Sequence, residues 1–235
     1  MEFVFGEKVF QSEVRKASDL KPVLAFPEAL KEDFDAYYMF RDSFKNDEDA
    51  EIIRKAGLRY DYTLIPPNDV GGESIKTYGH YHPESGDGLT YPEVYQVLDG
   101  RAFFIMQKPS GEKIEDVIVV EAKKWDVVVV PPNYGHVTIN PADEDLITSN
   151  WVCRNFSSIY EPYTERRGAC YYYINGEWVR NRNYENTPEI RFAKPENVLE
   201  VKGNMYELVH SIERLEFLVK PRKHSEVFKN AFEFV

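Results

Sequence analysis

Cysteine is scarce in this chain, because its 235 residues include only Cys153 and Cys170. The two form no C-x-x-C pair and are too few for a disulfide framework, which excludes the small secreted folds that depend on disulfides. We expect both thiols to be reduced and to be buried as small apolar side chains.

Long hydrophobic runs are also missing. No apolar stretch approaches the ~20 residues that a membrane helix needs. The first six residues, Met1 to Gly6, lack the basic start and the apolar core of a signal peptide. We therefore expect a cytoplasmic protein with no membrane partner.

Basic residues are fewer than acidic residues in this chain. The chain has 29 Lys and Arg residues against 40 Asp and Glu residues, which leaves a formal net charge of −11. Proteins that bind nucleic acids usually carry a basic footprint, so we expect no nucleic-acid partner. An anionic ligand would have to be held by a local pocket.

Internal repeats and low-complexity linkers are absent as well, whereas 43% of the residues are hydrophobic and 14% are aromatic. At this length, such a composition can bury one sizeable core. We expect a main domain at residues 59–195, an N-terminal arm with short helices and strands at 1–58, and a mainly helical C-terminal extension at 196–235.

From Arg59 onward, short segments rich in Val, Ile, Tyr and Thr are separated by Pro, Gly, Asn and Asp turns, a pattern typical of an all-β sandwich or barrel. The segments that we predict to be strands are Arg59–Ile65, Ser74–Tyr81, Pro92–Leu98, Ala102–Gln107, Asp116–Glu121, Asp126–Val130, Gly135–Ile139 and Ile147–Cys153. Asp99-Gly100 and Asn175-Gly176 predict hairpin turns, the second joining Ala169–Ile174 to Glu177–Arg180. Val127 to Val130 is apolar on both faces, which indicates a strand buried between sheets.

Helices are expected mainly near the two ends. Pro27–Phe34 and Asp47–Ala56 have helical character, the latter with Asp47 as N-cap and Gly57 as the stop. Near the C-terminus, one helical face is predicted from Met205, Leu208, Val209, Ile212 and Leu215, with Asn204 and Glu207 as capping pair and Pro221 at the end. The closing segment from Val227 is apolar enough to dock on the barrel or on a partner.

The candidate functional residues centre on the segment Gly79-His80-Tyr81-His82-Pro83. In an extended strand, side chains at i and i+2 point to the same face, so His80 and His82 can coordinate one metal ion. Glu93 and His136 would complete a set of three imidazole nitrogens and one carboxylate oxygen. Such a set leaves open positions on a metal that prefers five or six ligands, which indicates chemistry rather than a purely structural site.

The spacing around these ligands resembles the two motifs of the cupin superfamily. Six residues separate Glu93 from Gly100, three separate His136 from Asn140, and Pro131 lies five residues before His136. The resemblance implies a small double-sheet β-barrel, or jelly roll, whose interior carries the metal. We therefore expect an all-β cupin fold with helical N- and C-terminal additions.

The chain departs from the cupin pattern at two places. The interval between His82 and Glu93 is lengthened by Ser85-Gly86-Asp87-Gly88 and its neighbours, which indicates an enlarged loop between the ligand strands. Trp125 stands where the second motif normally has glycine. The ligand set itself is complete.

Within the superfamily, the stretch from Thr63 to Tyr173 resembles the cupin-type phosphoglucose isomerases of archaea and some bacteria. The resemblance rests on Lys76-Thr77-Tyr78-Gly79-His80-Tyr81-His82, Pro92-Glu93-Val94-Tyr95, Pro131-Pro132-Asn133-Tyr134-Gly135-His136 and Ser157-Ser158-Ile159-Tyr160. It implies a glucose-6-phosphate isomerase of glycolysis and gluconeogenesis, an aldose-ketose isomerase that acts on a phosphosugar. It also implies a homodimer.

The same resemblance assigns roles to individual residues. His80, His82, Glu93 and His136 would hold one divalent ion per subunit, and Glu93 would also act as the catalytic base, with Tyr95 beside the substrate. Fe²⁺ or Mn²⁺ is our first expectation for a mixed nitrogen and oxygen site, with Zn²⁺ or Ni²⁺ as alternatives.

The phosphate contacts are implied only by the family. Thr63, Thr77, the backbone of Gly79 and Tyr160 fall where the family's phosphate-binding residues lie. Hydroxyl and N–H groups donate to phosphate oxygens, and glycine permits a close backbone approach. Strand alternation points Lys76 away from the face of Thr77, which leaves Lys76 outside the site.

Plainer interpretations stand beside these assignments. In these interpretations, the histidines and Glu93 are core residues with satisfied hydrogen bonds or ion pairs. The threonines and tyrosines, which are Thr63, Thr77, Tyr95 and Tyr160, are ordinary strand residues. Two other functions also remain: a metal-dependent cupin dioxygenase, because the same ligands hold iron for oxygen chemistry, and a sugar-binding cupin without catalysis.

Overall fold

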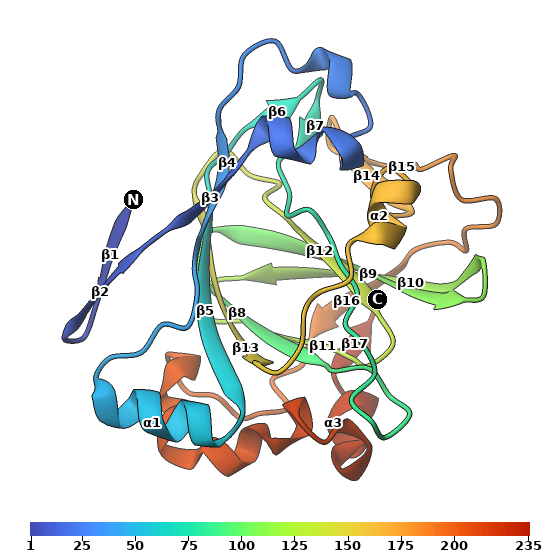
Figure 1. The fold of residues 1–235 in the computed structure, drawn as a ribbon. Coiled ribbons are helices and arrows are strands. Elements are labelled where there is room, and N and C mark those ends of the chain that lie inside the picture. The colour runs from blue at the N-terminus through green and yellow to red at the C-terminus, as the bar shows by residue number, and fades with distance from the viewer.

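Two large sheets face each other in the computed structural model, which describes residues 1–235 (Figure 1). One sheet has six strands in the order β11 (Val127–Val130), β8 (Glu93–Asp99), β13 (Leu146–Cys153), β5 (Leu58–Ile65), β4 (Asp35–Phe40) and β3 (Glu13–Lys16). The other has five strands in the order β12 (Gly135–Ile139), β9 (Arg101–Ser110), β10 (Lys113–Lys123), β16 (Arg191–Pro195) and β17 (Phe232–Phe234). This is the all-β double-sheet architecture that the sequence predicts.

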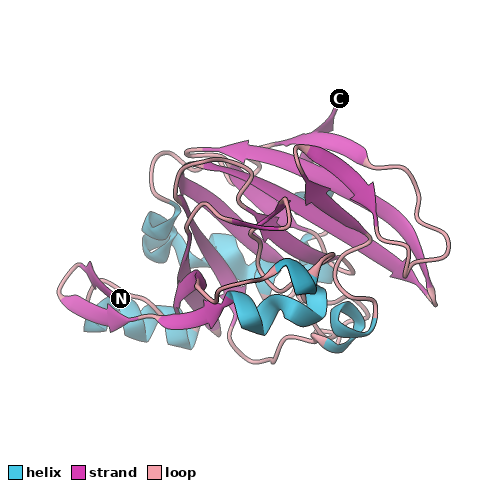
Figure 2. Cartoon of the chain, turned by 90° about the horizontal axis from the view of Figure 1, so that it is seen from above, coloured by secondary structure: helices cyan, strands magenta, loops and turns pink.

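Smaller elements surround the two sheets (Figure 2). A four-stranded sheet is formed by β15 (Glu177–Arg180), β14 (Tyr171–Ile174), β7 (Glu73–Ser74) and β6 (Asp69–Val70), and a terminal hairpin by β1 (Glu2–Phe5) and β2 (Lys8–Gln11). The α-helices are α1 (Asp47–Lys55), α2 (Glu161–Glu165) and α3 (Glu226–Lys229). The 3-10 helices are η1 (Ala17–Val23), η2 (Pro27–Ala29), η3 (Met205–Leu218) and η4 (Pro221–His224). None of these helices has the length and apolar character needed to cross a membrane.

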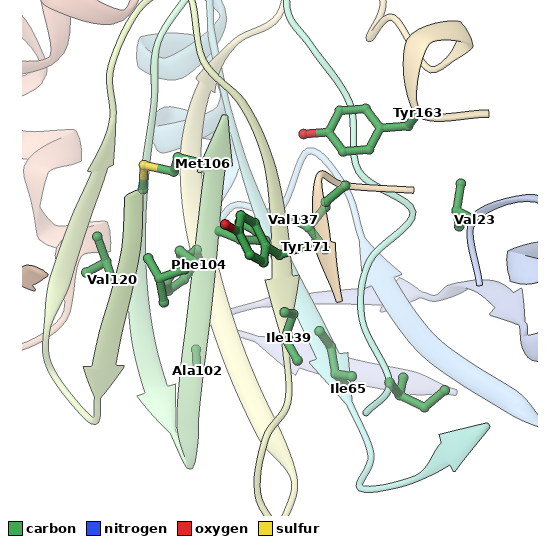
Figure 3. Packing of buried hydrophobic residues seen from close by; sticks show 14 of the residues in the cluster. Val23, Ile65, Ala102, Phe104, Met106, Val120, Val137, Ile139, Tyr163 and Tyr171 are labelled. Carbon is green, nitrogen blue, oxygen red and sulfur yellow. The ribbon is translucent and has the colours of Figure 1, made fainter. Parts of the chain in front are cut away.

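The main hydrophobic cluster lies between the two sheets (Figure 3). Because side chains alternate across a strand, every second residue faces this interior. Phe104 and Met106 of β9, Ile139 of β12 and Ile65 of β5 are all buried there. The two cysteines are free and buried, as predicted.

A second cluster covers the outer face of the six-stranded sheet. Val128 and Val130 face the interior, whereas Val127 and Val129 belong to this second cluster. The C-terminal extension packs over it, and Trp151 Nε1 donates to the backbone oxygen of Met205 at 3.1 Å. The strand is therefore buried on both faces as predicted, but its outer face is covered by the C-terminal extension rather than by a sheet.

Two strand predictions need correction. Ser74–Tyr81 is not a continuous strand: beyond β7 it pairs only through isolated bridges, among them His80 with His136. The positive φ of 86° at Gly79 interrupts the extended conformation. Asp99-Gly100 is not a hairpin turn, because β8 and β9 belong to different sheets and Gly100, at φ 76°, carries the chain from one to the other. The Asn175-Gly176 hairpin is confirmed.

Three helix predictions also differ from the structure. Only η2 forms within Pro27–Phe34. The N-cap of α1 is Asn46, whose side chain accepts a hydrogen bond from Asp49 N–H at 2.8 Å, and not Asp47. The predicted C-terminal helix is a run of 3-10 turns that is broken at Ser211 and ends before Pro221. Asn204 caps this run as predicted. Glu207 does not complete the capping pair, because its side chain pairs with Lys45.

Candidate metal centre and substrate cavity

The four predicted metal ligands come together. One ligand atom from each of His80, His82, Glu93 and His136 lies within 4.8 Å of all the others. His80 Nε2 is 3.0 Å from His82 Nε2, and Glu93 Oε2 is 3.3 Å from Nε2 of both His82 and His136. Three imidazole nitrogens and one carboxylate oxygen therefore converge on one small volume.

Both sheets contribute to this convergence. Glu93 begins β8 in the six-stranded sheet, whereas His136 lies in β12 of the five-stranded sheet. His80 is joined to His136 by a pair of backbone hydrogen bonds, His80 N–H to His136 O at 3.3 Å and the reverse at 3.1 Å. The segment that carries His80 and His82 is thus anchored beside β12 although it is not a regular strand.

Neighbouring groups orient the ligands and leave one atom free. Asn150 Nδ2 donates to Glu93 Oε1 at 2.7 Å, and His82 Nδ1 lies 2.8 Å from the backbone oxygen of Tyr91. Partners behind the ligands commonly fix their orientation in metal sites. Glu93 Oε2 is buried without a hydrogen-bond partner, a costly state for a carboxylate unless a cation balances it. The donor set and this orphaned oxygen both fit a divalent metal ion.

The electrostatics of the cluster favour the protonation states that bind metals. Burial and the nearby charges of His136 and His82 lower the pKa of His80 well below its ordinary value. Burial works to raise the pKa of Glu93, but the close contacts of its carboxylate with His136 and His82 outweigh burial, so the pKa lies well below its ordinary value. Neutral imidazoles and an ionised carboxylate are the forms that ligate metals.

The metal cluster opens into a cavity of about 340 Å³, within the size range of small-molecule sites. His80, His82, Glu93 and Tyr95 lie on its wall. Tyr95 Oη is 3.0 Å from His136 Nε2, so its hydroxyl reaches the cluster. Burial raises the pKa of Tyr95 well above its ordinary value, and the charge of Glu93 adds to the rise, which keeps the phenol protonated.

The same cavity contains all the residues predicted to contact phosphate: Thr63, Thr77, Gly79 and Tyr160. Gly79 meets both demands that favour glycine, because its φ is positive and an added Cβ would lie 2.6 Å from a Val137 methyl group. Thr77 Oγ1 already accepts a hydrogen bond from Thr138 N–H at 3.0 Å, which leaves its own O–H free to donate. Lys76 lies outside the cavity, as expected, and it is paired with Glu73.

Several charged wall residues were not predicted. Arg59 and Asp61 precede Thr63 by four and two residues on β5, so strand alternation could have placed them on the same face. Arg41 and Arg15 come from outside the stretch that carries the resemblance, and no motif marks them. Asn150, the partner of Glu93, belongs to a strand whose pairing partners could not be predicted.

Comparison with known proteins identifies a matching family. A family model described as glucose-6-phosphate isomerase matches residues 14–189. The glucose-6-phosphate isomerase of Thermococcus litoralis is 31% identical over 137 residues, which cover 57% of this chain and 65% of that protein. The enzyme of Thermococcus onnurineus is 30% identical over 138 residues, with the same coverage. The matched region thus spans slightly less than two thirds of each relative.

Solved structures of other proteins align only weakly with this chain. An oxalate decarboxylase structure from Bacillus subtilis aligns with a TM-score of 0.39 and 16% identity, covering 54% of this chain and 28% of that one. A recombinant oxalate oxidase in complex with glycolate aligns with a TM-score of 0.35 and 15% identity, covering 45% and 47%. These likenesses are too weak to bear on activity. The family match extends over well more than half of the chain, through β3 to β15 and every predicted ligand, and the chain therefore belongs to the glucose-6-phosphate isomerase family.

Proposed function

We propose that this protein is a metal-dependent glucose-6-phosphate isomerase that interconverts glucose 6-phosphate and fructose 6-phosphate in glycolysis and gluconeogenesis. One observation carries the proposal. A single cavity has His80, His82 and Glu93 of the four-residue cluster on its wall, with His136 directly behind them, together with hydroxyl and backbone groups suited to phosphate. A phosphosugar has a reacting carbonyl end and a phosphate end, and the cavity offers a site for each.

His80, His82, Glu93 and His136 would hold the metal. A divalent ion bound by these four residues would supply Lewis-acid polarisation of the sugar oxygens at C1 and C2. The mixed ligand set favours Fe²⁺ or Mn²⁺, ahead of Zn²⁺ or Ni²⁺. A protein with one such site binds one ion per subunit.

Glu93 is the residue that we assign to proton transfer. Its carboxylate is held by Asn150 and lies on the cavity wall with its pKa lowered. An ionised carboxylate within reach of the substrate can accept the proton that leaves C1 or C2 and return it to the other carbon. Tyr95, with its phenol kept protonated, would donate a hydrogen bond to a sugar oxygen.

The phosphate end is assigned to Thr63, Thr77, Gly79 and Tyr160. Their hydroxyl and N–H groups are donors, and donors arranged around one point suit an acceptor with three oxygens. The proposal also includes a cytoplasmic location and a homodimer.

The proposal is tested with a coupled assay in which glucose 6-phosphate formed from fructose 6-phosphate is oxidised. We expect turnover by the parent protein and a loss of at least about 100-fold in kcat for Glu93→Gln, the scale of general base removal. Glu121→Gln, on the exposed side of β10 and paired with Arg101, is the matched control and should keep full activity. An inactive metal-loaded parent would contradict the proposal, and oxygen uptake with phenolic substrates would identify a dioxygenase instead.

A further inference from the structure

Three arginines line the cavity, and they differ in how their charge is balanced. Arg59 contacts the buried carboxylate of Asp61 at 2.9 Å, and Arg41 lies 3.5 Å from the same carboxylate and 3.4 Å from Glu13. Arg15 has no carboxylate within ion-pair distance, and its Nε is buried without a hydrogen-bond partner. Of the three, Arg15 is the cation that the protein leaves unbalanced.

Arg15 reaches the cavity from the N-terminal arm. It lies on β3, the edge strand of the six-stranded sheet, opposite Tyr37 of β4. Its guanidinium carbon is 5.8 Å from the centre of the Tyr78 ring, a distance at which a cation is attracted by the ring face. Tyr78 stands between Thr77 and Gly79 in the sequence, so this contact brings Arg15 close to the segment assigned to phosphate.

A row of aromatic rings separates Arg15 from the metal ligands. The Tyr78 ring packs against Tyr160 with 5.5 Å between ring centres, and Tyr160 packs against His80 with 5.7 Å between centres. Arg15 is at one end of this row and His80 at the other. The unbalanced cation is therefore set apart from the metal cluster by the length of two rings.

The negative charge of a phosphate group explains why a cation is needed at the phosphate end of the cavity. Thr63, Thr77, Gly79 and Tyr160 supply neutral donors only, whereas a phosphate monoester carries a charge of about −1.5 to −2 at pH 7. The chain as a whole carries −11 and repels such an anion. A guanidinium offers a planar fork of N–H donors that matches two phosphate oxygens at once.

We propose that Arg15 binds the phosphate group of the substrate and thereby sets the preference of this site for phosphorylated over free sugars. The assignment rests on the proposed function for the identity of the sugar, but not for the binding of phosphate. Arg15 is a specificity-determining residue in this account, because it contacts the phosphate and not the reacting carbons.

The test compares Arg15→Met with the parent and with Arg101→Met, an arginine exposed on β9 and paired only with Glu121. We expect Arg15→Met to raise KM for fructose 6-phosphate by about 10- to 100-fold, the scale of a lost charge-assisted hydrogen bond, with kcat within about twofold. Binding of inorganic phosphate, measured by calorimetry, should weaken by a similar factor. Metal content and the Arg101→Met variant should be unchanged.

Two further variants keep the test decisive if Arg15→Met folds poorly. Arg15→Gln keeps a polar side chain without charge and should show the same loss, whereas Arg15→Lys keeps the charge and should recover part of the affinity. Unchanged affinity for both inorganic phosphate and fructose 6-phosphate in a folded, uncharged variant would overturn the assignment. If the parent shows no isomerase turnover, the proposed function fails, and the phosphate calorimetry still decides the role of Arg15.

Discussion

At the scale of single residues, the two threonines of the phosphate end are not equivalent. Thr77 Oγ1 accepts the Thr138 N–H, so its hydroxyl also holds two segments of the fold together. Thr63 lies on the same cavity wall without a side-chain partner of that kind. A change in ligand binding is therefore easier to interpret at Thr63 than at Thr77.

Thr63→Val should raise KM for fructose 6-phosphate by about 3- to 15-fold, the effect of one lost neutral hydrogen bond, while metal content and the unfolding midpoint stay the same. Thr77→Val should weaken binding as well, but it should also lower the free energy of unfolding by about 1–3 kcal/mol, because the buried Thr138 N–H loses its partner. Steady-state kinetics, metal analysis and urea unfolding measure the three quantities. Loss of metal from either variant would refute the separation of the two ends.

The convergence of the four candidate metal ligands was predicted from the sequence for a physical reason. A tight ligand set needs fixed residue types at short spacings, and His80 and His82 meet that need within one segment. Arg15 has no such signature, because its place in the cavity follows from the pairing of β3 with β4. Sequence spacing does not reveal that pairing.

At the scale of elements, a buried ion pair ties the N-terminal arm to the four-stranded sheet. Lys76 and Glu73 are both buried and paired; Lys76 Nζ also donates to Val23 O at 2.8 Å, and Glu73 Oε2 accepts from Ala25 N–H at 2.7 Å. If one partner of this pair is removed, the charge of the other stays buried without access to water. Removing one partner should therefore cost much more than removing an exposed pair.

Lys76→Met should lower the free energy of unfolding by about 3–5 kcal/mol, as expected when a buried carboxylate loses its cation. Lys55→Met, which breaks the exposed pair with Glu51 on α1, serves as the control and should have no measurable effect. Urea unfolding of the two variants and the parent makes the comparison. Equal stability of the two variants would show that the buried pair does not stabilise the arm.

The enlarged loop between His82 and Glu93 is fastened to the C-terminal extension. Arg222 donates from its backbone N–H to Asp87 Oδ2 at 3.1 Å and from its side chain to the Asp87 backbone oxygen. The same loop carries Tyr91, whose backbone oxygen lies beside His82 Nδ1. The extension can thus influence how firmly a metal ligand is held.

Arg222→Ala should therefore weaken metal binding by about 3- to 10-fold, below the 10- to 100-fold typical of direct partners of a ligand, because it acts one contact further away. Lys223→Ala, next to it on η4 and paired with Glu216, should leave metal affinity unchanged. Competition with a fluorescent chelator measures both. Identical metal affinity in the two variants would exclude a role for the extension at the site.

Strands were predicted correctly where apolar residues alternate with a period of two. Predictions failed where the backbone conformation of single residues determines the course of the chain. Seven strands of the two large sheets, β5 and β8 to β13, were predicted from alternation and turn residues, whereas β3, β4, β16 and β17 were not. Trp125 occupies a position where glycine is usual, yet it adopts φ 76° and donates its N–H to Val97 O at 2.7 Å. The turn is thus kept without glycine, a result that residue preferences alone do not predict.

At the scale of the whole molecule, the fold brings distant parts of an acidic chain to one cavity. The N-terminal arm supplies Arg15, the six-stranded sheet supplies Glu93 and Thr63, and the five-stranded sheet supplies His136 to the metal cluster that adjoins the cavity. The C-terminal extension covers the outer face of the sheet and fastens the ligand loop. The four candidate metal ligands lie together and the candidate phosphate contacts lie on the cavity wall, whereas the packing of the two ends of the chain was not predicted.

The dependence of isomerase activity on bound metal tests the central claim most directly. Activity with fructose 6-phosphate should fall to background when a chelator removes the ion and should return in proportion to the metal rebound, reaching its maximum at one ion per subunit. Fe²⁺, Mn²⁺, Zn²⁺ and Ni²⁺ should be compared at equal occupancy, with Fe²⁺ or Mn²⁺ expected to restore the most activity. Full activity in protein shown by metal analysis to contain none of these ions would contradict the account.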